Sequence, residues 1–126
     1  MKMKYTMLAG ILFAFISILF YSLGSHTVKS MLEQKMMTDS YNIACSFTMY
    51  HGLALILLGL LMKNFPEAKF QYVSIGFIAG SLLFQGIIFL KAFSEITKLG
   101  FLNPVGGSIL FLSWILFFFQ VLKRMK

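Results

Sequence analysis

The side chains in this sequence that could do chemistry centre on two histidines. His26 follows a first apolar run, and His51 lies about two turns inside a second one. Two imidazoles brought to the same end of a helical bundle could hold a metal or act as axial ligands to haem. Other polar side chains are expected at that end because the third and fourth spans meet the same side. The candidate ligand-binding cluster consists of His26, His51, Tyr50, Lys91, Glu95 and Asn103.

A structural interpretation of both histidines competes with this one. In it, His26 anchors a helix end at the membrane interface and His51 bonds a neighbouring helix. The sequence contains no Cys-x-x-Cys-His, no His-x-x-x-His and no paired carboxylates. We therefore predict no metal and no resident cofactor, with haem or quinone as the ligand classes that the cluster would suit.

Catalytic motifs have little support. Ser25 precedes His26, but no aspartate stands at a spacing that would complete a triad, and Gly-x-Ser-x-Gly is absent. A lipid-directed enzyme would have only Ser25, His26 and Glu95 to use. Cys45 is the single cysteine, which excludes an intramolecular disulfide. We predict that the protein is not an enzyme.

The elements that position these residues follow from composition. The chain has 126 residues, of which 59% are apolar and 12% charged, so it has too little polar surface to cover a soluble fold. Each of four apolar runs is long enough to cross about 30 Å of hydrocarbon as a helix. The sequence predicts one all-α membrane domain over 1–126, a four-helix bundle with spans near 5–24, 43–62, 70–90 and 104–122.

The segments between the runs carry helix-boundary signals. Thr38 to Ser40 offers capping oxygens before the second span, and Asn103 precedes Pro104 at the start of the fourth. The first span follows two lysines, as a signal peptide would, but no Ala-x-Ala site follows it. We expect a retained helix. Apolar residues at helical spacing predict a short interfacial helix in the loop 25–42, namely Val28, Met31, Leu32 and Met36.

The basic residues predict the orientation. The net charge of +7 would suggest nucleic acid in a soluble protein, but here the charges flank apolar runs, and we expect no nucleic-acid partner. Seven lie at the end with both termini, namely Lys2, Lys4, Lys63, Lys69, Lys123, Arg124 and Lys126. Four lie at the other end, namely Lys29, Lys35, Lys91 and Lys98. Both termini are therefore expected in the cytoplasm of a multi-pass protein in a bacterial plasma or inner membrane.

No Asp, Glu, Lys or Arg lies inside the four expected spans, and His51 is the one histidine within them. All four carboxylates fall in loops, whereas proton-coupled transporters usually carry an ionisable group within the bilayer. Drug–proton antiport is therefore disfavoured. We expect Gln85 to form an interhelical hydrogen bond and small residues to form seams between helices. The residues assigned to helix packing are Gly24, Gly52, Gly76, Gly80, Gln85, Gly86, Pro104, Gly106 and Gly107.

Four ordered strings in this chain resemble a known family. They are Leu23-Gly24-Ser25-His26, the run 49–55 around His51, Leu83-Phe84-Gln85-Gly86, and Asn103-Pro104-Val105-Gly106-Gly107 followed by Trp114. Together they are similar to the small four-span membrane proteins of domain of unknown function family 423, which includes animal transmembrane protein 256. The resemblance implies four helices, a membrane location and association with larger membrane assemblies. It implies no settled activity.

Two functional hypotheses follow. The first is a non-catalytic subunit or accessory factor of a larger membrane complex, with the lipid bilayer, other membrane subunits or a second copy as partners. The alternative is a membrane-embedded binder or carrier of haem, quinone or lipid that uses the histidine cluster.

Overall fold

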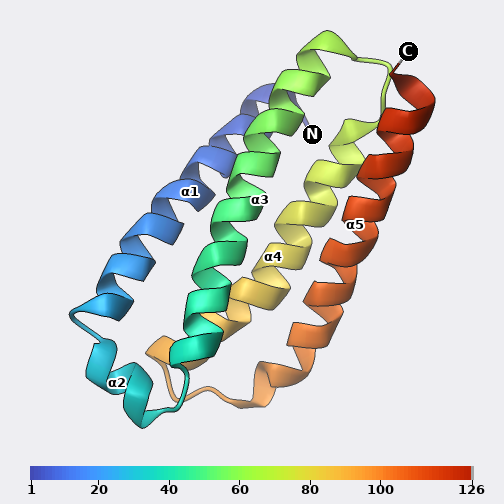
Figure 1. Ribbon diagram of the computed structural model, residues 1–126. Coiled ribbons are helices and arrows are strands. Elements are labelled where there is room, and N and C mark those ends of the chain that lie inside the picture. Colours follow the sequence, from blue (N-terminus) through green and yellow to red (C-terminus); the bar gives the residue numbers. More distant parts are fainter. Residues whose placement is uncertain (126) are drawn as a thin grey trace.

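Four long helices make up most of the chain in the computed structural model, which describes residues 1–125 (Figure 1). They are α1 (Met3–Ser25), α3 (Thr38–Asn64), α4 (Phe70–Phe93) and α5 (Leu102–Arg124). Each of the four expected spans falls inside one of these helices, and all four helices are long and apolar enough to cross a membrane. Two short elements complete the described part, α2 (Lys29–Gln34) and the 3-10 helix η1 (Lys98–Phe101).

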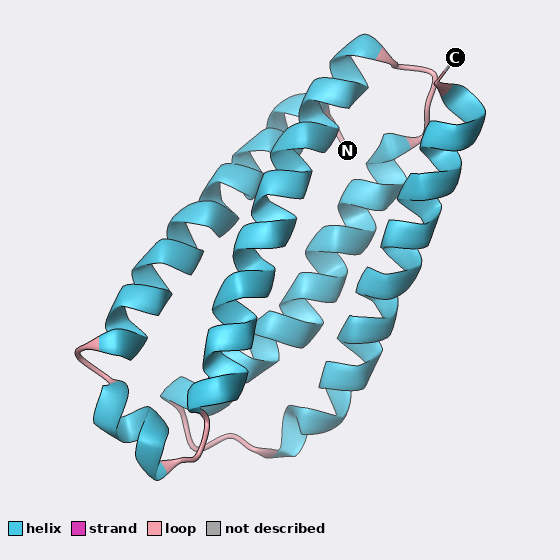
Figure 2. Ribbon diagram, viewed as in Figure 1, coloured by secondary structure: helices cyan, strands magenta, loops and turns pink. Residues whose placement is uncertain are grey.

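The long helices lie side by side in the order α1, α3, α4, α5 (Figure 1). A short loop joins α3 to α4, whereas the other two connections contain α2 and η1, and neighbouring helices run antiparallel (Figure 2). Both termini and the loop between α3 and α4 lie at one end, which we call the terminal end. The segments holding α2 and η1 lie at the opposite end. Lys126, counted among the basic residues of the terminal end, falls outside the described residues.

The main core lies between the inner helices α3 and α4 and the adjoining face of α5. Leu55 and Leu58 of α3 pack there with Phe77 of α4 and Phe117 of α5. The outer faces of α1 and α5 expose long apolar side chains, as Phe15 and Phe118 illustrate. Such continuous apolar faces suit contact with lipid rather than water.

The α1–α3 interface depends on small residues seven positions apart. A Cβ added at Gly10 of α1 would stand 2.5 Å from the carbonyl oxygen of Gly52 in α3. One heptad further on, the Ser17 hydroxyl donates to the Cys45 carbonyl oxygen at 2.7 Å. A Cβ at Gly59 would collide with Met7, and one at Gly24 with the Tyr41 ring. Close approach of these two backbones therefore requires residues with little or no side chain.

Glycines also line the α4–α5 interface. A Cβ at Gly80 would lie 2.8 Å from Leu110, and one at Gly106 would lie 2.5 Å from the backbone nitrogen of Phe84. Gly76 meets Ser113 in the same way. Gly76 and Gly80, which form a Gly-x-x-x-Gly pair in α4, therefore both pack against α5 of the same chain.

The helix starts differ from the sequence expectation. The residue preceding α3 is Met37, and no side chain among residues 38–40 makes a capping hydrogen bond there. The Asn103 amide donates to the Phe84 carbonyl oxygen at 2.9 Å instead of capping α5. The physical reason is that η1 leads directly into α5, so Asn103 lies inside the helix and faces α4. Pro104 sits in the first turn, where its missing N–H costs nothing.

The short helix expected in the first loop is present as α2, and the bundle holds it in place. Leu32 is 1% exposed and packs with Tyr41, Cys45 and Ala92. Met36, which was expected on the same apolar face, instead ends the helix with a positive φ of 56° and lies 91% exposed. The loop is therefore a packed element of the fold.

Candidate functional site

The structure distributes the six candidate ligand-binding residues over separate places. His26 and Tyr50 line a groove of about 510 Å³ between α1 and α3. His51 lies on the other side of α3, in a groove of about 530 Å³ that α5 completes and that Tyr50 also borders. The two histidines therefore do not share a pocket.

The remaining candidates lie elsewhere. Lys91 and Asn103 line a third groove, of about 300 Å³, formed by the neighbouring ends of α3, α4 and α5. Glu95 is exposed in the loop that follows α4. Within the described residues 1–125, no group of three or more His, Cys, Asp or Glu side chains could hold a metal ion.

His51 uses both of its ring nitrogens inside the bundle. Its Nδ1 lies 2.7 Å from the Phe47 carbonyl oxygen, one helical turn earlier in α3. Its Nε2 accepts a hydrogen bond from the indole nitrogen of Trp114 in α5 at 3.1 Å. Because Trp114 can only donate and a carbonyl can only accept, the hydrogen of this imidazole is on Nδ1. A metal or haem iron would have to displace Trp114 from the one available lone pair.

His26 has a different environment. It is exposed at the end of α1, and hydroxyl-bearing side chains line much of the groove beside it. The Ser25 hydroxyl donates to the carbonyl oxygen of Tyr21 at 3.0 Å, within its own helix. Ser25 and His26 are therefore adjacent in sequence but form no Ser–His hydrogen bond. The polar lining residues are Ser17, Tyr21, Ser22, Ser25, Ser46 and Tyr50.

Gln85 departs from its expected role. The side chain is 2% exposed, but neither its amide nitrogen nor its oxygen has a hydrogen-bond partner within residues 1–125. The expected interhelical hydrogen bond is therefore not formed. The reason is its surroundings, since the wall near Gln85 that α1 contributes is made of Phe13, Ile16 and Phe20, whose side chains offer neither donor nor acceptor.

Sequence reasoning missed the role of Lys35. Its ammonium group donates to three carbonyl oxygens at the end of α4, those of Lys91, Ala92 and Ser94, at 3.2, 2.8 and 3.0 Å. These carbonyls have no partner inside the helix, and a cation there also meets the negative end of the helix dipole. Lys35 stands among other loop lysines, so no sequence signal distinguishes it as a cap.

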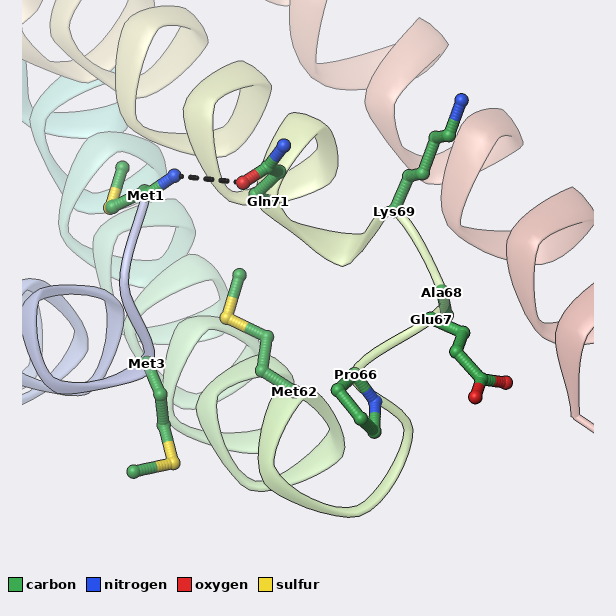
Figure 3. A pocket seen from close by; sticks show the side chains of 8 residues that line it. All are labelled: Met1, Met3, Met62, Pro66, Glu67, Ala68, Lys69 and Gln71. Atoms are coloured by element: carbon green, nitrogen blue, oxygen red, sulfur yellow. Dashed lines mark hydrogen bonds between the residues drawn. The ribbon is translucent and has the colours of Figure 1, made fainter.

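The terminal end contains a shallow pocket of about 260 Å³ next to the chain's start. The Met1 ammonium donates to the Gln71 side-chain oxygen at 3.2 Å, which ties the N-terminus to the first turn of α4 (Figure 3). Glu67 and Lys69 border this pocket but point away from one another (Figure 3). The pocket therefore gathers no group of side chains suited to catalysis.

Comparison with known proteins agrees with this architecture. Residues 20–107 match the family described as "Protein of unknown function (DUF423)". A UPF0382 membrane protein of Staphylococcus haemolyticus is 26% identical over 121 residues, which cover 96% of this chain and 98% of that protein. The UPF0382 membrane protein YwdK of Bacillus subtilis is 24% identical over 123 residues, with the same two coverages. No solved structure matches the chain.

These matches extend over the segments that carry both histidines, Gln85 and the glycine interfaces. They confirm the resemblance seen in the four sequence strings, and the relatives are themselves described as membrane proteins. With its four apolar helices, this chain is a bacterial membrane protein that belongs to the DUF423 family.

Proposed function

We propose that this protein is a non-catalytic helical subunit or accessory factor of a larger membrane complex. We further propose that it receives a transmembrane helix of its partner in the groove between α3 and α5. This α3–α5 groove is lined by Phe47, Tyr50, His51, Gly107, Leu110, Phe111 and Trp114.

The observation that carries the proposal is the environment of Gly107. A Cβ at this glycine would meet nothing nearer than a ring carbon of Phe84 at 3.9 Å. At the adjacent Gly106 the nearest atom would lie at 2.5 Å. Gly106 is thus used for packing within the chain, whereas Gly107 leaves space along the groove. Small residues of this kind let a second helix approach closely within a membrane.

The walls of the α3–α5 groove also suit a protein partner. Phe111 is 69% exposed, Tyr50 58% and Trp114 44%, so three aromatic side chains stand beside the glycine. A ridge of side chains on a partner helix would gain dispersion contacts with these rings. The non-catalytic part of the proposal draws support from His51 and Ser25, because each makes a hydrogen bond inside the fold.

Native mass spectrometry of the protein, extracted in mild detergent from its own membrane, tests this proposal. We expect the wild type to carry a second polypeptide in a defined ratio. Gly107→Leu fills the groove and is expected to release that polypeptide. Ser108→Leu is the matched control, because Ser108 is the next residue of α5, is exposed and does not line the groove. A wild type that is recovered only as a monomer would contradict the proposal, and so would partner loss in both variants.

A second candidate function is supported by the groove between α1 and α3. There His26 and Tyr50 stand with several serine hydroxyls at one end of the membrane span, an arrangement suited to the polar head of a lipid-like molecule. If the protein is such a binder or carrier, the same mass spectra should show a small adduct on the wild type. His26→Ala should remove that adduct and His51→Ala should retain it, since His51 lies on the other side of α3.

The proposed orientation places both termini in the cytoplasm. Its support is the distribution of charge between the two ends, since the terminal end has more lysine and arginine than the α2 end. Basic residues favour the cytoplasmic side of bacterial membranes.

A further inference from the structure

We propose that a second, distinct site in this protein binds a lipid-soluble molecule whose head is a six-membered ring carrying a hydroxyl group. The site is a cavity of about 170 Å³ between α1, α3 and α4. We call it the Gln85 cavity, and its lining residues are Phe13, Ile16, Phe20, Thr48, Ser81, Leu82, Gln85, Gly86 and Phe89.

The primary observation is a pair of buried polar groups that the fold does not satisfy. Gln85 is 2% exposed and Ser81 is 4% exposed. Within residues 1–125, neither the Gln85 amide nor the Ser81 hydroxyl has a hydrogen-bond partner. The two residues are four positions apart in α4, so they lie on the same face of that helix, and both line the cavity. Unpaired polar groups are costly in an apolar interior, which makes them candidates to meet a ligand.

Three other buried hydroxyl groups of the bundle are satisfied within their own helices, whereas Thr6 of α1, which does not line the cavity, also has no partner within residues 1–125. The hydroxyls of Thr48, Ser74 and Ser113 each donate to the carbonyl oxygen four residues earlier in their own helix. Ser81 has the same option within α4 but makes no such bond. Its hydroxyl and the Gln85 amide are therefore both free to bond a molecule in the cavity.

The shape of the cavity restricts what that molecule can be. Three aromatic side chains, Phe13, Phe20 and Phe89, form its walls, with the Phe20 and Phe89 ring centroids 4.8 Å apart in an edge-to-face arrangement. Gly86 leaves space on the α4 side, since a Cβ there would meet nothing nearer than 3.8 Å. Cavities of about 150 Å³ are known to hold one benzene ring. The Gln85 cavity therefore has room for a single ring.

The polar groups restrict the ligand further. The amide offers both an acceptor oxygen and donor hydrogens, and Ser81 can donate or accept. A ring hydroxyl can donate to the Gln85 oxygen, and its two lone pairs can accept from the amide nitrogen and from Ser81, so a single hydroxyl can bond both polar residues. No Lys, Arg, Asp or Glu lines the cavity, which disfavours a charged head.

The position of the cavity indicates that the molecule enters from the bilayer. Leu82, which borders it, is 59% exposed on the apolar surface of the bundle. Gln85 lies well inside α4, about 12 Å from the helix end at Phe93 at 1.5 Å rise per residue. An apolar tail attached to the ring can therefore remain among the lipid chains. This site is separate from the α3–α5 groove, and the two proposals can fail independently.

The test uses p-cresol as the probe and p-xylene, in which a methyl group replaces the hydroxyl, as its matched control. The full chain is placed in lipid bicelles with its glutamine side-chain amides labelled with ¹⁵N, and each probe is titrated while the NMR signals are followed. The chain has four glutamines, Gln34, Gln71, Gln85 and Gln120. Gln85→Met assigns the signal of interest, and the other three serve as internal controls.

We expect p-cresol to shift the Gln85 signals saturably and to bind at least about fivefold more tightly than p-xylene, as the gain of one or two hydrogen bonds implies. Ser81→Ala should weaken p-cresol binding by about threefold or more. Gly86→Leu should abolish the shift, because the leucine side chain occupies the cavity. A backbone amide spectrum that matches the wild type at distant residues shows that each variant is folded.

Three results would overturn the proposal. The first is the absence of a saturable shift at Gln85 in a folded wild type. The second is an equal response to p-xylene, which would make the cavity a purely apolar one. The third is rapid exchange of the Gln85 amide with water together with no response to p-cresol, which would identify the cavity as a hydration site.

Discussion

Trp114 of α5 donates the hydrogen of its indole nitrogen to Nε2 of His51 in α3, across a distance of 3.1 Å. The two rings are also in contact, with their centroids 5.9 Å apart. This pair links α5 directly to α3, although α5 packs mainly against α4. It assigns the second histidine a structural role and leaves it no lone pair for a ligand.

The Trp114–His51 hydrogen bond should be measurable as a coupling free energy. Trp114→Phe removes the donor and leaves Nε2 unpaired in a side chain that is 3% exposed, so we expect a loss of about 1–2 kcal/mol in the free energy of unfolding. His51→Leu removes the partner. A double-mutant cycle, followed by circular dichroism in mixed micelles, should give a coupling of about 1 kcal/mol. Additive effects of the two changes would contradict this assignment.

The tautomer of His51 is a separate prediction. The geometry requires the hydrogen on Nδ1, which lies 2.7 Å from the Phe47 carbonyl oxygen. In ¹⁵N NMR of histidine-labelled protein, we expect one ring with a protonated Nδ1 and an unprotonated Nε2. Because Trp114→Phe removes the indole donor, the Nε2 signal should then move and the Nδ1 signal should stay nearly constant. A wild-type ring with hydrogen on Nε2 would refute the hydrogen bond from Trp114.

Lys35 is predicted to stabilise the end of α4. Lys35→Met keeps the length of the side chain but removes the ammonium group that bonds three carbonyl oxygens. We expect the free energy of unfolding to fall by about 1–2 kcal/mol, given the partial exposure of the group. Hydrogen exchange in residues 92–98 should become faster. The control is Lys29→Met, which changes an exposed lysine of α2 and should leave both measurements unaltered.

The glycines of this chain should respond to substitution in two distinct ways. At Gly52 a Cβ would stand 2.8 Å from the carbonyl oxygen of Gly10, which is a backbone atom that cannot easily move. Gly52→Ala is therefore expected to cost about 1–3 kcal/mol through overpacking. Gly86→Ala should cost less than about 0.5 kcal/mol, because its Cβ meets no atom within 3.8 Å. Equal costs in the two variants would contradict the packing described here.

The helices could be predicted from the sequence because hydropathy reports directly on the requirement to cross a bilayer. Hydropathy does not predict which glycines form the helix interfaces at Gly10, Gly52 and Gly80, because a glycine in a helix can face a neighbouring helix, a cavity or lipid. Gly106 and Gly107 illustrate the limit, as they are adjacent in sequence but only the first is packed tightly. The rotation of α5 about its axis decides which of them faces α4, and no local pattern encodes that rotation.

The candidate site was harder to predict for a related reason. Topology correctly brings the end of α1 and the start of α3 to the same end of the bundle, and His26 and Tyr50 do share a groove. Tyr50 and His51 are consecutive, however, and successive residues of a helix point about 100° apart. His51 therefore faces α5, while His26 remains beside α1. Both histidines lie toward the α2 end of the bundle, but a shared end does not imply contact.

The orientation of the bundle can be tested with two matched single-cysteine additions. Glu67 lies in the α3–α4 loop at the terminal end, and Glu95 lies in the loop after α4 at the other end. Both are exposed, and each change to cysteine removes one negative charge. The native Cys45 is 1% exposed and should give little background labelling.

With both termini in the cytoplasm, as the positive-inside rule predicts, a membrane-impermeant maleimide should label Glu95→Cys in intact cells and Glu67→Cys only after permeabilisation. The reverse pattern would show that charge does not determine the insertion of this chain, and labelling of both sites in intact cells would indicate two populations of opposite orientation.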